Sequence, residues 1–173
     1  FHGKKWTNFI EIHFTLPLSY CSICLQELLK YKLMKAFSSD FGEKVNLDHP
    51  LPEPPNPLFE RDVFVSLNGP WDFAVTKSDQ KPTDYPNKII VPFAPETSLS
   101  GLDFHIDKTD YLHYSKEFEV PEAFAGHDAI LHLDAVDQVC DVFFNGVLIG
   151  HHESGYSPIA IHLSGLQKKN RIE

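Results

Sequence analysis

Cysteine is scarce in this sequence, and so are uninterrupted apolar runs. The three cysteines form no repeating framework, and an odd number of this kind is not typical of a disulfide-stapled secreted module. The stretch 14–29 is apolar, but Pro17 and the pair Gln26-Glu27 interrupt it. It is therefore too short and too polar for a membrane span, and it makes a poor signal peptide.

Cys21 and Cys24 have the CxxC spacing of a zinc half-site or a redox pair. No second CxxC or HxxxH follows at the spacing of a zinc finger, and no βαβ pattern surrounds the pair. We interpret the two residues as incidental thiols in an apolar stretch, and we predict neither a metal nor a cofactor.

Positive charge is also limited, with 15 Lys and Arg residues against 24 Asp and Glu residues and a net charge of −9. A chain with this net negative charge repels nucleic acid and anionic lipid surfaces, so we expect neither as a partner. Uncharged sugars are compatible with it. Hydrophobic residues make up 42% of the chain, which is enough for a core, and the fourteen Phe residues favour β-structure.

Residues 1–33 differ in character from the rest, because they carry four lysines against two glutamates while the remainder is strongly acidic. The only methionine is Met34. We interpret residues 1–33 as an atypical extension, upstream sequence translated in frame, that packs poorly against the domain or not at all. Residues 34–57 form a leader whose section 46–57 holds five prolines. The section 46–57 should be extended and lie across the next domain. The alternative is that this section is a ligand for a peptide-binding module.

From residue 58 onward the chain alternates short apolar runs with turn residues, which predicts many short strands and no long helix. In 114–120, for example, Tyr114, Lys116, Phe118 and Val120 share one face and Ser115, Glu117 and Glu119 the other. The pattern predicts an antiparallel β-sandwich. Its expected strands are 63–67, 71–75, 88–91, 114–120, 129–133, 139–144, 147–151, 159–163 and 170–173, and its expected buried residues are Trp71, Phe73, Phe118, Leu131, Leu133, Val142 and Phe144.

Four segments follow one another in a specific order. They are 66–73 (SLNGPWDF), 91–97 (VPFAPET), 114–121 (YSKEFEVP) and 135–158, which holds AVD, VFFNG and GHHESGYSP. Together they resemble the N-terminal sugar-binding domain of family 2 glycoside hydrolases, the group of β-galactosidases, β-glucuronidases and β-mannosidases. The sequence departs from the family pattern at Ser115-Lys116, where two arginines are usual, at Ser154, usually a glycine, and at His162, usually an Asp.

The resemblance covers 58–173 and implies an all-β jelly-roll sandwich, similar to galactose-binding domains and truncated at its C-terminal edge. It also implies that an immunoglobulin-like domain and a catalytic (β/α)8 barrel follow in the intact enzyme. A barrel alone needs about 250 residues. We therefore expect this chain to lack the catalytic glutamates, to be inactive alone, and to bind a carbohydrate beside the other domains of the same polypeptide.

Two groups of residues invite a chemical reading that we do not favour. Glu117 and Glu119 share a face, as a catalytic carboxylate pair must, but alternation with Phe118 places that face in solvent. His151 and His152 suggest a metal site, but neighbouring residues on a strand point to opposite sides. We expect His152 to be a hydrogen-bonded structural residue.

Asn145-Gly146 is a strong signal for a type I′ hairpin turn. The resemblance adds a second role, because the Asn of this turn reaches the active site and hydrogen-bonds the sugar in the β-galactosidase branch. We therefore name Asn145 as the substrate-binding residue. We expect the parent protein to be a retaining O-glycosidase of carbohydrate metabolism, located in the cytoplasm. A free-standing lectin-like module and a purely structural domain are the alternatives, and a homo-oligomer is left open.

Overall fold

The computed structural model describes residues 10–15, 42–51, 64–124 and 126–173. The described residues form strands and three single-turn 3-10 helices, η1 (Gly42–Lys44), η2 (Ser98–Ser100) and η3 (Glu122–Phe124). The strands are β1 (Ile10–Thr15), β2 (Phe64–Ser66), β3 (Gly69–Thr76), β4 (Asn87–Val91), β5 (Tyr111–Glu119), β6 (Ala129–Ala135), β7 (Val139–Phe144), β8 (Val147–Glu153), β9 (Ile159–Leu163) and β10 (Lys169–Ile172). Within these ranges no helix is long and apolar enough to cross a membrane.

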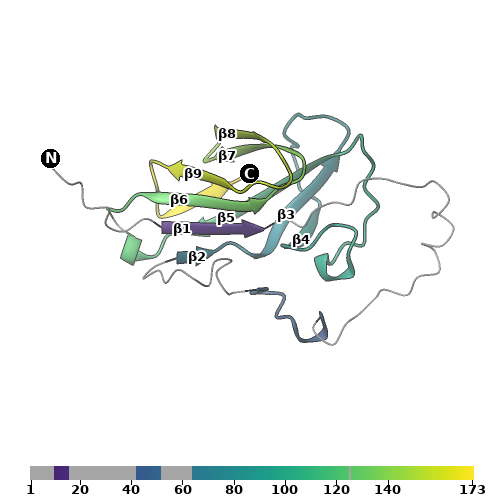
Figure 1. The fold of residues 1–173 in the computed structure, drawn as a ribbon, viewed down its shortest axis with the longest axis horizontal. Helices are drawn as coiled ribbons and strands as arrows, with labels where there is room; N and C mark the ends of the chain where they lie inside the picture. Colours follow the sequence, from purple (N-terminus) through teal and green to yellow (C-terminus); the bar gives the residue numbers. More distant parts are fainter. Residues whose placement is uncertain (1–9, 16–41, 52–63, 125) are drawn as a thin grey trace.

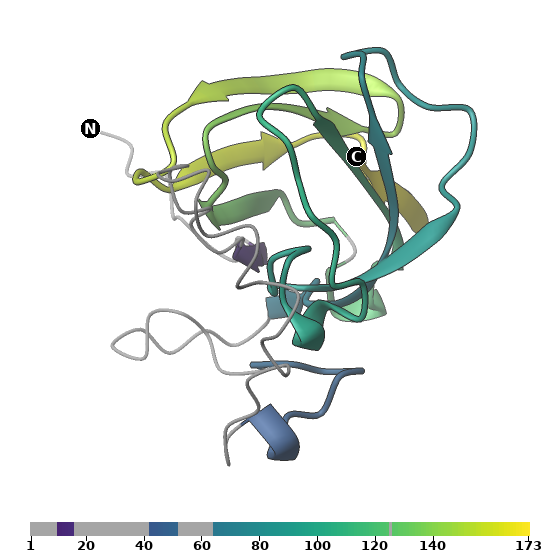
Figure 2. The same cartoon turned by 90° about the vertical axis from the view of Figure 1, so that its right-hand side faces the viewer.

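The strands form two sheets, which are visible as two layers in Figures 1 and 2. The smaller sheet has the order β2-β1-β6-β9, and the larger has the order β4-β3-β5-β10-β7-β8. Alternate residues of both sheets meet between the layers, as in β6, whose buried positions are 129, 131 and 133. The predicted antiparallel β-sandwich is confirmed, and all seven predicted core residues are at most 9% exposed.

Strand β10 occupies the middle of the larger sheet. It pairs antiparallel with β5, where Asn170 lies opposite Phe118, and with β7, where Ile172 lies opposite Phe144. Ile172 is buried at 2% exposure and belongs to the core. The C-terminal segment therefore joins the two halves of this sheet.

Strand β1 contradicts, for residues 10–15, the prediction that residues 1–33 pack poorly against the domain or not at all. Its backbone pairs in parallel with β2 on one side and with β6 on the other, and Figure 1 shows it between them. At least these six residues are part of the smaller sheet. The rest of 1–33 lies outside the described residues, and so do Cys21, Cys24 and Met34.

The described part of the proline-rich leader lies against the connection between β2 and β3. Pro50 is buried, and the Asn68 amide Nδ2 donates to its carbonyl oxygen at 3.3 Å. Residues 46–51, the described part of the section 46–57, are non-helical as predicted. They are not extended throughout, because the His49 amide donates to the Asn46 carbonyl and closes a turn. Residues 52–57 lie outside the described ranges.

Candidate functional site

The candidate sugar contact lies at the tip of the hairpin formed by β7 and β8. Asn145 and Gly146 have φ angles of 49° and 83°, so both adopt the left-handed conformation that a type I′ turn requires. The predicted turn is confirmed. Phe144, just before it, is buried at 5% exposure, whereas Asn145 itself is exposed.

The Asn145 side chain connects the turn to β10. Its Nδ2 donates to Asn170 Oδ1 at 3.1 Å, and its Oδ1 accepts from the Arg171 backbone amide at 2.8 Å. The backbone amide of Asn145 also donates to the Arg171 carbonyl at 2.9 Å. The two side-chain bonds fix the rotamer of an exposed side chain, so the amide is held in one orientation.

Asn170 is the buried partner in this arrangement, with 3% exposure. Its Oδ1 also accepts from the Gln167 backbone amide at 2.9 Å, and its Nδ2 donates to the Gln167 carbonyl at 2.7 Å. The sequence analysis missed this residue. An Asn inside an otherwise strand-like segment is the signal that would have indicated it, because Asn is depleted in strands unless its amide has partners.

The Asn145 amide keeps unused hydrogen-bonding capacity. An Asn side chain has two N–H donors and an oxygen with two lone pairs, and the internal bonds use one donor and one lone pair. One donor and one acceptor therefore remain on an exposed side chain whose orientation is fixed. A sugar hydroxyl, which donates and accepts, is complementary to such a pair.

Beside the turn, the outer face of the larger sheet carries ion pairs. Arg171 binds Glu117, and Lys169 lies 3.5 Å from Glu119. The hydrogen bond that the Arg171 guanidinium donates to Glu117 raises the pKa of Arg171. The two glutamate side chains are 67% and 62% exposed, as alternation predicted. Because each carboxylate has its own cation in open solvent, the pair does not form an acid–nucleophile arrangement.

Lys116 occupies one of the two positions where the family pattern has arginine. Its Nζ donates to the Pro70 carbonyl at 2.8 Å and lies 5.9 Å from the centre of the Trp71 ring. Burial is the main cause that lowers its pKa, and the nearby charge of Lys88 adds to it. Lys116 thus connects β5 to the start of β3.

The neighbouring histidines of β8 have separate partners. His151 lies on the exposed surface between Asp141 (Nδ1–Oδ1 2.6 Å) and Glu153 (Nε2–Oε1 3.2 Å). His152 Nε2 lies 3.1 Å from the Ser157 hydroxyl. The predicted hydrogen bond of His152 is confirmed, and its structural role stays a prediction. Among the described residues, no group of three or more His, Cys, Asp and Glu side chains is arranged to hold a metal ion.

Two glycines of the segment 150–158 are required by close approaches. A β-carbon at Gly150 would lie 2.7 Å from Ile161 Cδ1, and one at Gly155 would collide with the Asp137 carboxylate. These contacts account for glycine at both positions. They hold β8 and the following loop near β9 and the β6–β7 connection.

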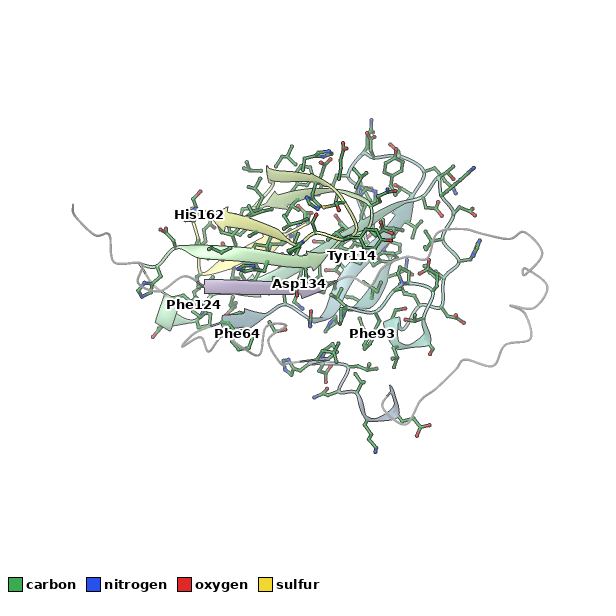
Figure 3. The ribbon with its side chains drawn as sticks, viewed as in Figure 1. Phe64, Phe93, Tyr114, Phe124, Asp134 and His162 are labelled. Atoms are coloured by element: carbon green, nitrogen blue, oxygen red, sulfur yellow. The ribbon has the colours of Figure 1, made fainter. Side chains whose placement is uncertain are left out.

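An apolar concavity lies at one end of the sandwich, between the two sheets and beside η3. Val65, Phe118, Phe124 and Leu166 are among its lining residues, and Figure 3 marks Phe124 at this end. Apart from Glu119, its lining residues are apolar, so it suits sugar hydroxyls poorly. The polar hairpin tip is therefore the better candidate for a sugar contact.

Relatives of the chain are glycosidases. A β-glucuronidase of Streptococcus agalactiae is 27% identical over 101 residues, which cover 55% of this chain and 16% of that protein. A β-galactosidase of Thermoanaerobacter pseudethanolicus is 32% identical over 60 residues, which cover 35% of this chain and 8% of that protein. No protein-family model matches the chain.

The fold is also found in a solved glycosidase. A β-glucuronidase structure from Faecalibacterium prausnitzii aligns with a TM-score of 0.50 and 24% identity, over 62% of this chain and 20% of that one. This likeness concerns the fold alone. The chain spans far less than two thirds of each relative's length.

The chain therefore has a β-sandwich fold and a sequence similar to those of glycosidases. More particularly, the chain is related to β-glucuronidases and β-galactosidases, and its sandwich is consistent with the N-terminal domain of family 2 glycoside hydrolases.

Proposed function

We propose that the chain is the sugar-binding N-terminal domain of a retaining glycoside hydrolase that cleaves β-linked O-glycosides. In this proposal Asn145 contacts the sugar, and other domains of the same polypeptide supply the two catalytic carboxylates. The proposal draws on the two glycosidase relatives. The matched region makes up only 16% of the β-glucuronidase and 8% of the β-galactosidase. By itself the chain should hydrolyse no aryl β-glycoside.

The observation that carries the sugar contact is the fixed, half-used amide of Asn145. Binding costs less when a polar group is already held in its bound orientation, because no rotamer freedom is lost. The bonds to Asn170 and Arg171 hold the amide in this way. They leave one donor and one acceptor for a sugar hydroxyl.

The same bonds favour a second candidate, in which the domain is structural and Asn145 only ties the hairpin to β10. The two functions make different predictions for the intact enzyme. Asn145→Gly keeps the freedom for positive φ and removes the side-chain amide. If that amide contacts the sugar, transition-state binding should weaken by roughly 1–3 kcal/mol, and kcat/KM should fall accordingly. Asn145→Gly also loses the two side-chain bonds to β10, so a stability control is needed.

Asn170→Ala provides that control, because it removes the buried anchor and leaves the Asn145 amide in place. If Asn145 contacts the sugar, Asn145→Gly should lose clearly more kcat/KM than Asn170→Ala at matched thermal stability. Equal losses in the two variants would favour the structural function. Full activity in Asn145→Gly would rule out the sugar contact.

A single described cysteine bears on the compartment of the parent enzyme. Cys140 is a free, half-buried thiol, and burial is the main cause that raises its pKa to about 11. A free thiol of this kind fits a reducing compartment. We keep the cytoplasm as the proposed location, and fractionation of cells producing the intact enzyme tests it.

A further inference from the structure

Strand β10 is shorter than the two strands between which it lies. It pairs only with the last four residues of β5, and the next residue, Glu173, exchanges backbone hydrogen bonds of 2.8 and 2.9 Å with Phe143 of β7. Among the described residues, no strand pairs with β5 at 111–113 or with β7 at 139–142 on the sides that face β10. We call these two segments the open edges.

The open edges carry apolar side chains that remain accessible. Leu112 points to the core side of β5, because it lies an even number of residues from the buried Phe118, yet it is 36% exposed. On the other edge Val139 is 61% exposed, and the inward-pointing Cys140 is only half-buried. A strand between the two edges would cover these groups and pair both rows of backbone groups.

The pairings of β10 set the register of such a strand. Antiparallel pairing advances by one residue on each strand per step, so the second residue after Glu173 falls between His113 and Asp141. The third residue falls between Leu112 and Cys140. Side chains alternate between the two faces, and the residue before Glu173 is buried in the core. The first and third residues therefore point inward, and the second points outward.

The surroundings of the outward position are acidic. Asp141 and Glu153 hold the imidazole of His151 between them, at 2.6 and 3.2 Å, so two carboxylates share at most one positive charge. On the opposite edge, His113 Nε2 lies 2.9 Å from the Thr76 hydroxyl. A lysine or arginine at the outward position would meet a net negative surface, which favours opposite charge across neighbouring strands.

We propose that the open edges bind the residues that directly follow Glu173 in the intact polypeptide, with apolar side chains at the first and third positions and a basic side chain at the second. β10 already runs between the two strands, and its neighbour Glu173 is still bonded as a strand residue. Both glycosidase relatives extend far beyond the matched region, which is 16% of one and 8% of the other. The inference rests on the proposed function, which requires further domains of the same polypeptide. Strand addition obtains affinity from backbone bonds and specificity from alternate side chains.

The test compares two short extensions added to the complete chain after Glu173. Cys21→Ser and Cys24→Ser leave Cys140 as the only thiol. The extension Val-Lys-Val-Thr matches the inferred pattern, and Lys-Val-Thr-Val has the same composition shifted by one position. We expect the matched extension to slow alkylation of Cys140 and amide hydrogen exchange at 139–142 at least tenfold relative to the shifted one.

Exchange at 159–163 in β9, which belongs to the other sheet, is the internal control and should change much less. A folded sandwich with the matched extension only would also support the proposal. Equal alkylation and exchange rates with the two extensions, or an equal change in β9, would overturn it.

A second comparison tests the basic position. Glutamate in place of the lysine in the matched extension puts a carboxylate beside Asp141, and exchange at 139–142 should become at least threefold faster. Asp141→Asn should reduce this difference between the two extensions. No difference, or one that Asp141→Asn leaves unchanged, would contradict the basic preference. Neither readout uses catalysis, so failure here would leave the sugar contact of Asn145 to be decided by its own variants.

Discussion

Gly69 lies against the backbone of Asp48, so closely that a β-carbon on Gly69 would stand 2.7 Å from the Asp48 carbonyl oxygen. This contact fixes the leader at the start of β3. Gly69→Ala must therefore displace the leader as well as strain a residue with φ of +113°. We expect it to destabilise the chain by about 1–3 kcal/mol more than a glycine replacement without such a contact.

Gly165→Ala is the matched control, since Gly165 has φ of +72° and a β-carbon there would meet no atom of the described residues within 4 Å. Urea denaturation of both variants measures the difference. Displacement of the leader should also speed trypsin cleavage after Lys44 in Gly69→Ala only. Similar stabilities and cleavage rates in the two variants would show that the leader contact contributes nothing.

Asn170→Ala should destabilise the chain by about 1–3 kcal/mol, because it removes the buried side chain that makes three hydrogen bonds to Gln167 and Asn145. The measurement is the free energy of unfolding in urea. Gln167→Ala is an internal control, since Asn170 binds only its backbone and the change should be nearly neutral. A large loss in Gln167→Ala instead would mean that its side chain, not the amide network, supports this corner.

His151 predicts a pH dependence near neutrality. Its hydrogen bond to Asp141, and then that to Glu153, raise its pKa above the ordinary value of 6.5. Because the pKa is higher in the folded state, protonated His151 stabilises the fold. This stabilisation is complete below the unfolded-state pKa and is lost as the pH rises through the folded-state pKa. NMR titration should show a lower pKa in Asp141→Asn, with a smaller decrease in Glu153→Gln. His151→Gln should flatten the stability profile, and an unchanged profile would exclude this ion pair as its source.

Tyr85 predicts a second pH dependence, at alkaline pH. Burial, followed by the charge of Glu173, raises its pKa to about 12, and its hydroxyl donates to Glu173 Oε1 at 3.3 Å. The unfolded chain then loses this proton first, so stability falls from about pH 10 through 12. Urea denaturation at pH 9 and pH 11.5 should show a smaller loss for Tyr85→Phe than for wild type. Equal losses would assign the alkaline effect to other groups.

The sequence predicted the strands because alternation reports which residues face the core. The runs 139–144 and 159–163 match β7 and β9 at both ends. Alternation does not report which strands are neighbours, since any two strands with an apolar face satisfy it. The sheet order, and the place of β10 between β5 and β7, could therefore not be predicted.

Two local features escaped prediction for related reasons. β1 has a strand pattern, but the charge of residues 1–33 and the position of Met34 led us to exclude the segment. Asn145 was predicted as a turn residue because the Asn-Gly pair carries its own backbone preference. Its bond to Asn170 joins residues 25 positions apart, and no local pattern encodes such a contact.

The central place of β10 has a consequence for the order in which the chain folds. The hairpin of β7 and β8 and the antiparallel group of β3, β4 and β5 share no direct strand pairing. They join only when Lys169–Ile172 arrives between them. On a ribosome, residues 64–153 would leave the exit tunnel as two separate units with exposed edges. The six-stranded sheet therefore closes in one late step. One contact formed in that step joins Glu173 to Lys81, 92 positions earlier in the chain. Contacts between residues so far apart in sequence are slow to form.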